Sequence, residues 1–148
     1  MIQLDGAQIP ILPVALGIWA GVSLGGSLVA APAKFRAPSL EMTTALEVGR
    51  AQFLWVGITE AILCIGIIAS LLLWPVSYWK WMTAPIALFA LQRLAVMPAL
   101  DTRTLEVISG APAGETHLHI VYIILEILKF VALITAAFIS LRSLVTST

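Results

Sequence analysis

The 148-residue chain carries 8 Lys and Arg against 8 Asp and Glu, and charged residues make up only 11% of it. Soluble domains carry about 25% charged residues, so this composition, with a mean hydropathy of +1.02, excludes most water-soluble folds and also disorder. A formal net charge of zero argues against a phosphate-binding surface, so no nucleic-acid partner is expected. The length allows a single domain, residues 1–148, and the remaining class is an integral membrane protein.

Four apolar stretches are long enough to cross a bilayer, which takes about 20 residues. They cover residues 11–31, 53–74, 82–100 and 120–141. Because these stretches are long, unbroken and without the alternation that marks strands, each one predicts a helix. The sequence therefore predicts an all-α fold, an integral membrane four-helix up-down bundle with membrane lipid around it.

The connections between these spans differ in character. Pro38 disfavours helix at the residue before it, and Ser39 is the predicted N-cap of a helix that projects about three turns beyond the second span. The second connection, residues 75–81, is a tight turn flanked by Trp and Tyr side chains, which are typical of the headgroup level of a membrane. The third connection, residues 101–116, is polar and ends in a flexible loop rich in Gly, Ala and Pro.

Orientation follows from the basic residues near the span ends. The side of the first and third connections carries four of them, Lys34, Arg36, Arg50 and Arg103, and the opposite side carries Lys80 and Arg142. This bias predicts that both termini lie outside the cytoplasm. The predicted location is the bacterial inner membrane.

Four charged residues fall inside the predicted spans: Glu60, Arg93, Glu126 and Lys129. Each costs about 2.5–3.5 kcal/mol at a helix centre on insertion scales. At about 1.5 Å per residue, the first three lie near one depth below the cytoplasmic face, and Lys129 lies one turn deeper. Two acids and two bases at nearly one level predict a neutral, mutually paired cluster.

Helical periodicity places other polar residues with this cluster. His119, Tyr122, Glu126 and Lys129 form one stripe on the fourth span, while Arg50 and Gln52 lie at the mouth of the same level. These eight positions predict a polar pocket that opens toward the cytoplasmic face and binds or moves a small ligand or an ion: Glu60, Arg93, Glu126, Lys129, His119, Tyr122, Arg50 and Gln52.

Two other functions fit the same residues. In a membrane-embedded enzyme acting on a lipophilic substrate, Glu126 or Glu60 would act as general base and Arg93 or Lys129 would stabilise an oxyanion. In a structural or assembly subunit the charges would only fix the packing of the helices, as buried ion pairs can do without chemistry. The sequence leaves open whether the chain is an enzyme.

The first span contains the double small-residue motif formed by Gly17, Gly21 and Gly25. Such a stripe lets two helix backbones approach closely. The favoured interpretation is packing of the first helix within the chain, and the alternative is the seam of a homo-oligomer.

No metal or cofactor follows from the sequence. His117 and His119 are two residues apart, so on a helix their rings diverge and one ion does not reach both. No ligand spacing typical of zinc or haem sites is present, and the lone Cys64 makes no internal disulfide.

Short motifs run through most of the chain. They include Ala31-Pro32-Ala33-Lys34-Phe35 after the first span, Val48-Gly49-Arg50 before the second, Pro98-Ala99-Leu100-Asp101 with Arg103 after the third, and His119, Tyr122, Glu126 and Lys129 in the fourth. In these motifs the chain resembles a group of uncharacterised small four-span membrane proteins. The resemblance implies a four-helix fold and no particular activity.

Overall fold

The computed structural model describes residues 11–112 and 117–146, and this part of the chain contains helices and no strand. Four continuous helical stretches are long and apolar enough to cross a membrane: Ile11–Arg36, Met42–Leu73, Lys80–Ile108 and His117–Thr146. The prediction of four long apolar helices is confirmed. Each stretch is longer than the predicted span, because the polar residues that flank the apolar runs continue the helices.

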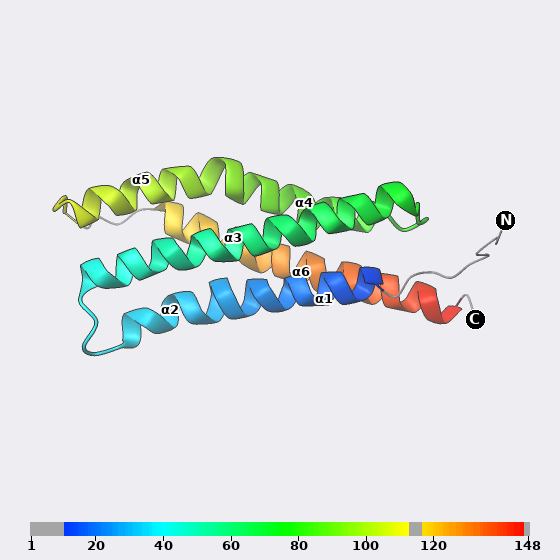
Figure 1. Cartoon of the computed structure of the whole chain (residues 1–148), viewed down its shortest axis with the longest axis horizontal. Helices are drawn as coiled ribbons and strands as arrows, with labels where there is room; N and C mark the ends of the chain where they lie inside the picture. The colour runs from blue at the N-terminus through cyan, green and yellow to red at the C-terminus, as the bar shows by residue number, and fades with distance from the viewer. Residues whose placement is uncertain (1–10, 113–116, 147–148) are drawn as a thin grey trace.

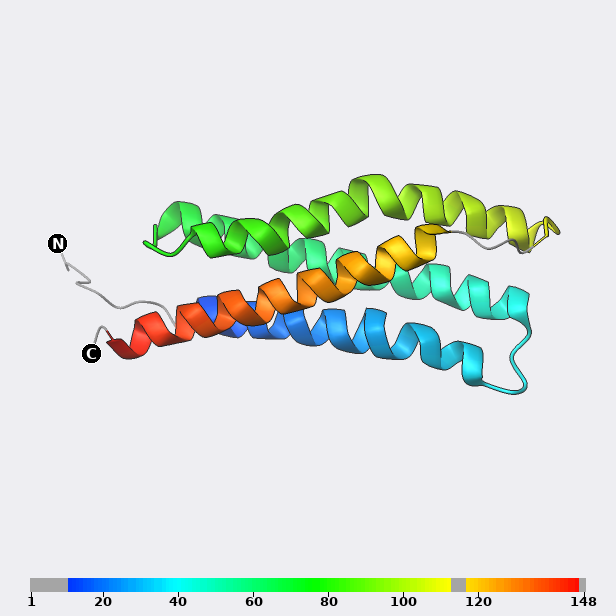
Figure 2. The same ribbon diagram turned by 180° about the vertical axis from the view of Figure 1, so that it is seen from behind.

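Successive stretches run in alternate directions, side by side (Figures 1 and 2). The first stretch contains α1 (Ile11–Val22) and α2 (Ala31–Ala33), and the second is α3 (Met42–Leu73). The third contains α4 (Lys80–Leu91) and α5 (Met97–Ile108), and the fourth is α6 (His117–Thr146). Helix α6 packs mainly on α1 and α4, while α3 packs on α1 and α5.

Two of the stretches widen into π-helix along the way. One π-helical segment, Ser23–Ala30, joins α1 to α2, and the other, Gln92–Val96, joins α4 to α5. Each ends two residues before a proline, Pro32 or Pro98. Proline has no N–H and its ring clashes with the carbonyl four residues earlier, so the preceding turn shifts its hydrogen bonds. Such π turns are often found at functional sites.

The apolar core occupies one end of the bundle, from the middle of the helices to the turn between α3 and α4. It is built from residues of α1, α3, α4 and α6, including Leu16, Ile67, Met82, Leu133 and Ala136. At the other end lie the connections after α2 and after α5 (Figure 1). Because the apolar core does not extend to this second end, the helices there leave room for a cavity.

The structure corrects two local predictions. Helix α3 starts at Met42 after Glu41, with no side-chain cap, so Ser39 is not its N-cap; the helix still projects as predicted, because it runs unbroken from Met42 to Leu73. A Cβ atom on Gly17, Gly21 or Gly25 would meet no other described atom within 4 Å. The glycine stripe therefore faces outward, and the prediction that it packs within the chain is wrong.

Candidate functional site

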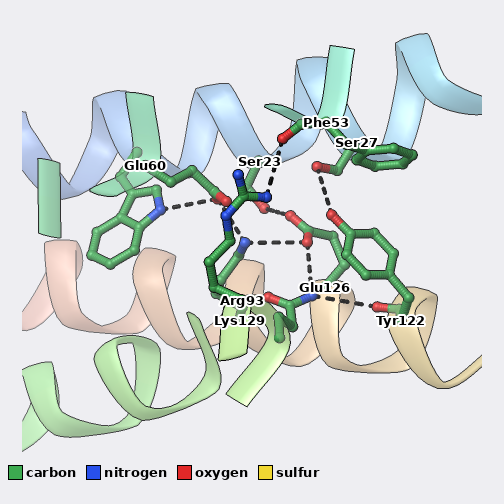
Figure 3. A network of polar contacts seen from close by, with 10 residues as sticks. Ser23, Ser27, Phe53, Glu60, Arg93, Tyr122, Glu126 and Lys129 are labelled. Carbon is green, nitrogen blue, oxygen red and sulfur yellow. Dashed lines mark hydrogen bonds and ion pairs between the residues drawn. The ribbon is translucent and has the colours of Figure 1, made fainter. Parts of the chain in front are cut away.

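Three of the four predicted intramembrane charges meet in the centre of the bundle (Figure 3). The Lys129 ammonium lies 2.6 Å from Glu60 Oε1 and 3.1 Å from Glu126 Oε2. Helix α3 supplies Glu60 and α6 supplies the other two, with one helical turn between Glu126 and Lys129. All three side chains are at most 5% exposed, so each charge depends on its partners rather than on solvent.

Neutral polar side chains from the other helices complete this network. Trp19 of α1 donates its indole N–H to Glu60 Oε1 at 3.0 Å. Ser23, at the start of the first π-helical segment, donates to Glu126 Oε1. Gln92, at the start of the second, donates from Nε2 to Glu126 Oε2 at 2.9 Å. Together with the triad these three residues define the central network, which draws on all four helical stretches.

Arg93 lies beside the central network without joining its ion pairs. In the described part of the chain it is not ion-paired to Glu60 or Glu126; its guanidinium donates to the carbonyl of Phe53 at 3.3 Å. The guanidinium also occupies the space next to Gly57, where a Cβ atom would collide with it. The predicted cluster of four paired charges is therefore a triad with a half-buried fourth charge at its edge.

Tyr122 separates the central network from the space at the loop end. Its hydroxyl lies 3.3 Å from Ser27 Oγ, and its ring packs edge-on against Phe53 with the centroids 5.2 Å apart. These three residues, Ser27, Phe53 and Tyr122, also line the large cavity described next. They form its floor, and the network lies directly beneath it.

A cavity of about 610 Å³ opens above this floor, between the first helical stretch, α3, α5 and α6. Most of its wall is apolar, with Leu28, Ala31, Met42, Leu46 and Val107 among the lining residues. Four basic side chains line it as well, Lys34, Arg36, Arg50 and Arg103, against a single carboxylate, Asp101. Binding sites for small molecules have this size and this combination of apolar walls with few charges.

Two of the cavity's basic residues are committed to carboxylates and two are not. Arg50 forms a two-pronged ion pair with Asp101, at 2.6 and 3.1 Å, and Arg103 pairs with Glu106 at 2.9 Å. Lys34 instead lies 5.2 Å from the ring centroids of Phe35 and Phe53.

Within the described residues, neither Lys34 nor Arg36 is ion-paired to a carboxylate. The cavity therefore has spare positive charge.

A second space opens sideways from the same region. A groove of about 580 Å³ runs between α3 and α5, and Arg50, Met97 and Asp101 line both this groove and the large cavity. Arg93 lines the groove at its inner end. The Arg50–Asp101 ion pair bridges the two helices where the groove meets the cavity.

The remaining predicted site residues fall in different places. His119 lines the large cavity and has no contact with the central network. Gln52 donates to the carbonyl of Gly26 and belongs to neither the cavity nor the network. The eight predicted residues are thus divided between a buried network, a cavity rim and one interhelical contact.

The sequence interpretation missed Trp19, Ser23 and Gln92. On a regular helix Gln92 points about 100° away from Arg93, so the charged residue was placed inward. Gln92 is 3% exposed and faces into the bundle, while Arg93 lies at the edge. The available signal was the helical spacing itself, because Gln92 follows Phe89 by three residues and Ser23 follows Trp19 by four, along the buried faces of their helices.

The chemistry open to the central network is narrow. Both carboxylates accept hydrogen bonds from protein groups, and no group of three or more His, Cys, Asp or Glu side chains in the described ranges is arranged to hold a metal ion. The space beside the network has a volume of only about 10 Å³. That is the room of a single water molecule, so a larger ligand fits the cavity above the network and not the network itself.

Comparisons with known proteins add no function. The chain matches no protein-family model, no curated protein sequence and no solved structure.

Proposed function

We propose that the chain is an integral membrane protein folded as an up-down four-helix bundle. The distribution of side chains supports this. Large apolar residues face outward, with Trp55, Ile62, Leu72 and Leu94 each at least 65% exposed. Four charged or amide side chains, Glu60, Gln92, Glu126 and Lys129, are buried inside. An exposed apolar surface of this extent, around buried charges, suits lipid and not water.

We further propose that the loop end faces the cytoplasm, as expected for an inner-membrane protein with both termini on the other side. Cysteine substitutions in a Cys64→Ala background test this orientation. Ser77→Cys, in the turn after α3, should react with an impermeant maleimide in intact cells, and Ser39→Cys should react only after lysis. The opposite pattern would reverse the orientation.

The function that the geometry supports best is binding of an amphipathic anion, a molecule with one apolar chain and one negative headgroup. A single observation carries the proposal: the 610 Å³ cavity has apolar walls and two basic residues, Lys34 and Arg36, that have no carboxylate partner among the described residues. Unpaired basic groups beside an apolar cavity favour an anionic headgroup, because hydrogen bonds to a charged acceptor are the strong ones. The groove between α3 and α5 supplies a lateral route from the membrane.

The central network has a supporting part in this function. It ties all four helical stretches together directly beneath the floor formed by Ser27, Phe53 and Tyr122. Within the described residues, no substrate-sized space reaches either carboxylate of the network. This favours a structural role for the buried charges and does not favour the enzyme alternative. The outward glycine stripe fits contact with a second copy of the chain.

Binding assays with matched headgroups test the proposal. The purified protein in a neutral detergent is titrated with a long-chain fatty acid and with the alcohol of the same chain length, and the bound fraction is measured by native mass spectrometry. We expect the fatty acid to bind at least about tenfold more tightly, because only its carboxylate pairs with the cavity's free cations. Equal binding of acid and alcohol would contradict the proposal.

Charge-removing variants locate the binding. Lys34→Gln should weaken fatty-acid binding about three- to tenfold, the usual range for one partly exposed charged hydrogen bond. Lys80→Gln removes the same charge from an exposed position at the opposite end of the bundle, and binding should not change. A similar loss in both variants would indicate nonspecific attraction to net charge and not a site in the cavity.

A further inference from the structure

One buried polar atom of the central network has no partner. Gln92 is 3% exposed, and its Oε1 is the only fully buried side-chain oxygen or nitrogen in the described residues without a hydrogen bond. Its orientation is fixed, because Nε2 donates to Glu126 Oε2 at 2.9 Å and lies 3.4 Å from the Tyr122 carbonyl. Turning the amide over would place an acceptor against two acceptors. Leaving Oε1 unpaired is costly, so a donor is expected beside it.

The space for that donor is present. A cavity of about 10 Å³ is lined by three charged or amide residues, Glu60, Gln92 and Arg93, and by Tyr122, Gly57 and apolar side chains. This is the volume that one water molecule needs, and a buried water needs two to four polar partners. The three polar residues offer an amide acceptor, a carboxylate acceptor and a guanidinium donor.

The charges around Glu60 explain why such a water matters. Glu60 and Glu126 share a single ammonium, so the triad carries one excess negative charge when both carboxylates are ionised. The first helical stretch presents only Trp19 and Ser23 here, which do not ionise in the relevant range. The ionisable groups near Glu60 are Cys64 on the same helix, α3, and, from the other elements, Glu126, Lys129 and Tyr122 of α6 and Arg93 of the second π-helical segment.

The excess negative charge of the triad is balanced in either of two protonation states of Glu60. In one, Glu60 is ionised and Arg93 compensates it from the edge of the network. In the other, Glu60 carries a proton, and Lys129 and Glu126 form a neutral pair by themselves. The hydrogen bonds from Trp19 and Lys129 both end on Oε1 of Glu60, which leaves Oε2 to receive the proton.

We propose that the small cavity holds one water molecule, bound to Gln92 Oε1, Arg93 and Glu60, and that Glu60 exchanges a proton with the outside through it. The route enters from the groove between α3 and α5, since Arg93 and Met97 line both the groove and the small cavity. The proton comes from solvent at the loop end of the groove, where the exposed Glu47 lines it, passes to the bound water, and forms an O–H bond on Glu60 Oε2 while Lys129 stays paired with Glu126. The inference does not depend on a ligand in the large cavity.

Infrared spectroscopy of the purified, reconstituted protein tests this directly. As pH falls, a protonated-carboxyl band should appear, and it should shift when H₂O is replaced by D₂O because the proton exchanges through the bound water. The difference between the wild-type and Glu60→Gln spectra should contain this band, because the subtraction removes the chain's other carboxyl groups. Identical pH-dependent carboxyl bands in the wild type and in Glu60→Gln would overturn the proposal.

A pair of glutamine variants tests the water itself, and both leave the triad's charges in place. Gln92→Met removes the orphaned acceptor and should slow the exchange of the carboxyl proton about tenfold, because the water loses one of its three hydrogen bonds. Gln52→Met makes the same change at an amide that bonds the Gly26 carbonyl away from the cavity, and exchange should keep the wild-type rate. Equal exchange rates in the two variants would show that no water at Gln92 carries the proton.

Discussion

The two ends of the bundle are built on different principles. Toward the turn between α3 and α4, Leu16, Ile67 and Leu133 are at most 1% exposed and pack together in the apolar core. Toward the loops, the same four helical stretches surround a cavity of about 610 Å³ with basic residues on its wall. The central network lies at the boundary between these two ends.

This difference indicates what the buried charges do. Buried charges are costly unless they are paired, and here they are placed where the helices stop packing tightly against one another. Their hydrogen bonds hold the four stretches together at the level where apolar contacts give way to open space. The packed end and the network thus form a rigid base for the hollow end.

The largest loss of stability is expected when the central network loses its buried cation. Lys129→Met leaves Glu60 and Glu126 buried without a cation, and we expect a loss of about 3–5 kcal/mol in the free energy of unfolding. Reversible unfolding in detergent measures it. The control is Lys80→Met, which makes the same substitution at an exposed lysine and should leave the free energy of unfolding almost unchanged.

A double variant then tests the pairing. Lys129→Met combined with Glu60→Gln should recover part of the loss, since the second change removes one unpaired charge. Strictly additive losses would mean that Lys129 and Glu60 do not interact, which contradicts their 2.6 Å contact.

The next effect compares packing at the two ends. Leu133→Ala in the packed end should cost about 2–3 kcal/mol, the low part of the usual range, because the proposed membrane environment would remove most of the transfer term and leave the cavity term. Leu46→Ala, on the wall of the existing cavity, should cost less than about 1 kcal/mol. Unfolding in detergent measures both, and equal costs would show that the two ends are packed alike.

A smaller effect is expected beside the network. Gly57→Ala introduces a Cβ atom that collides with the Arg93 guanidinium, the movable end of a long side chain, so the gain of about 1 kcal/mol that Ala brings to a helix interior should be lost there. Gly66→Ala on the same helix meets no described atom within 4 Å, so it serves as the matched control. If both variants unfold at the same denaturant concentration, Arg93 does not lie over Gly57.

The sequence was sufficient for the features that depend on regular helical geometry. Long apolar runs predicted four helices, and the depth of Glu60, Glu126 and Lys129 along their helices predicted that they meet. Both inferences need only the rise per residue and the cost of an unpaired buried charge. The same helical rise per residue was enough to place Arg50 near the mouth of the predicted pocket.

The other features of the site were missed or predicted only in part. Ser23 and Gln92 continue the buried faces of Trp19 and Phe89 at intervals of four and three residues, and Arg93, one residue further along, lies at the edge; they were missed because the charged residues were given more weight than the helical spacing. The sequence predicted a polar pocket toward this end, but not the size of the cavity or its apolar walls, because these depend on how far apart the helices lie. Trp19 was missed for a related reason, since an indole in an apolar span gives no sign of its hydrogen-bond partner.

The most direct test of the central claim is to fill the hollow end and measure binding. Leu46→Trp places a larger side chain on the wall of the 610 Å³ cavity, while Leu72→Trp makes the same change on α3 at a position that is 77% exposed. Dissociation constants for a long-chain fatty acid are compared with that of the wild type. The account predicts binding at least about tenfold weaker in Leu46→Trp, because the ligand and the indole compete for one volume, and unchanged binding in Leu72→Trp. Equal affinity in both variants would contradict a binding site in this cavity.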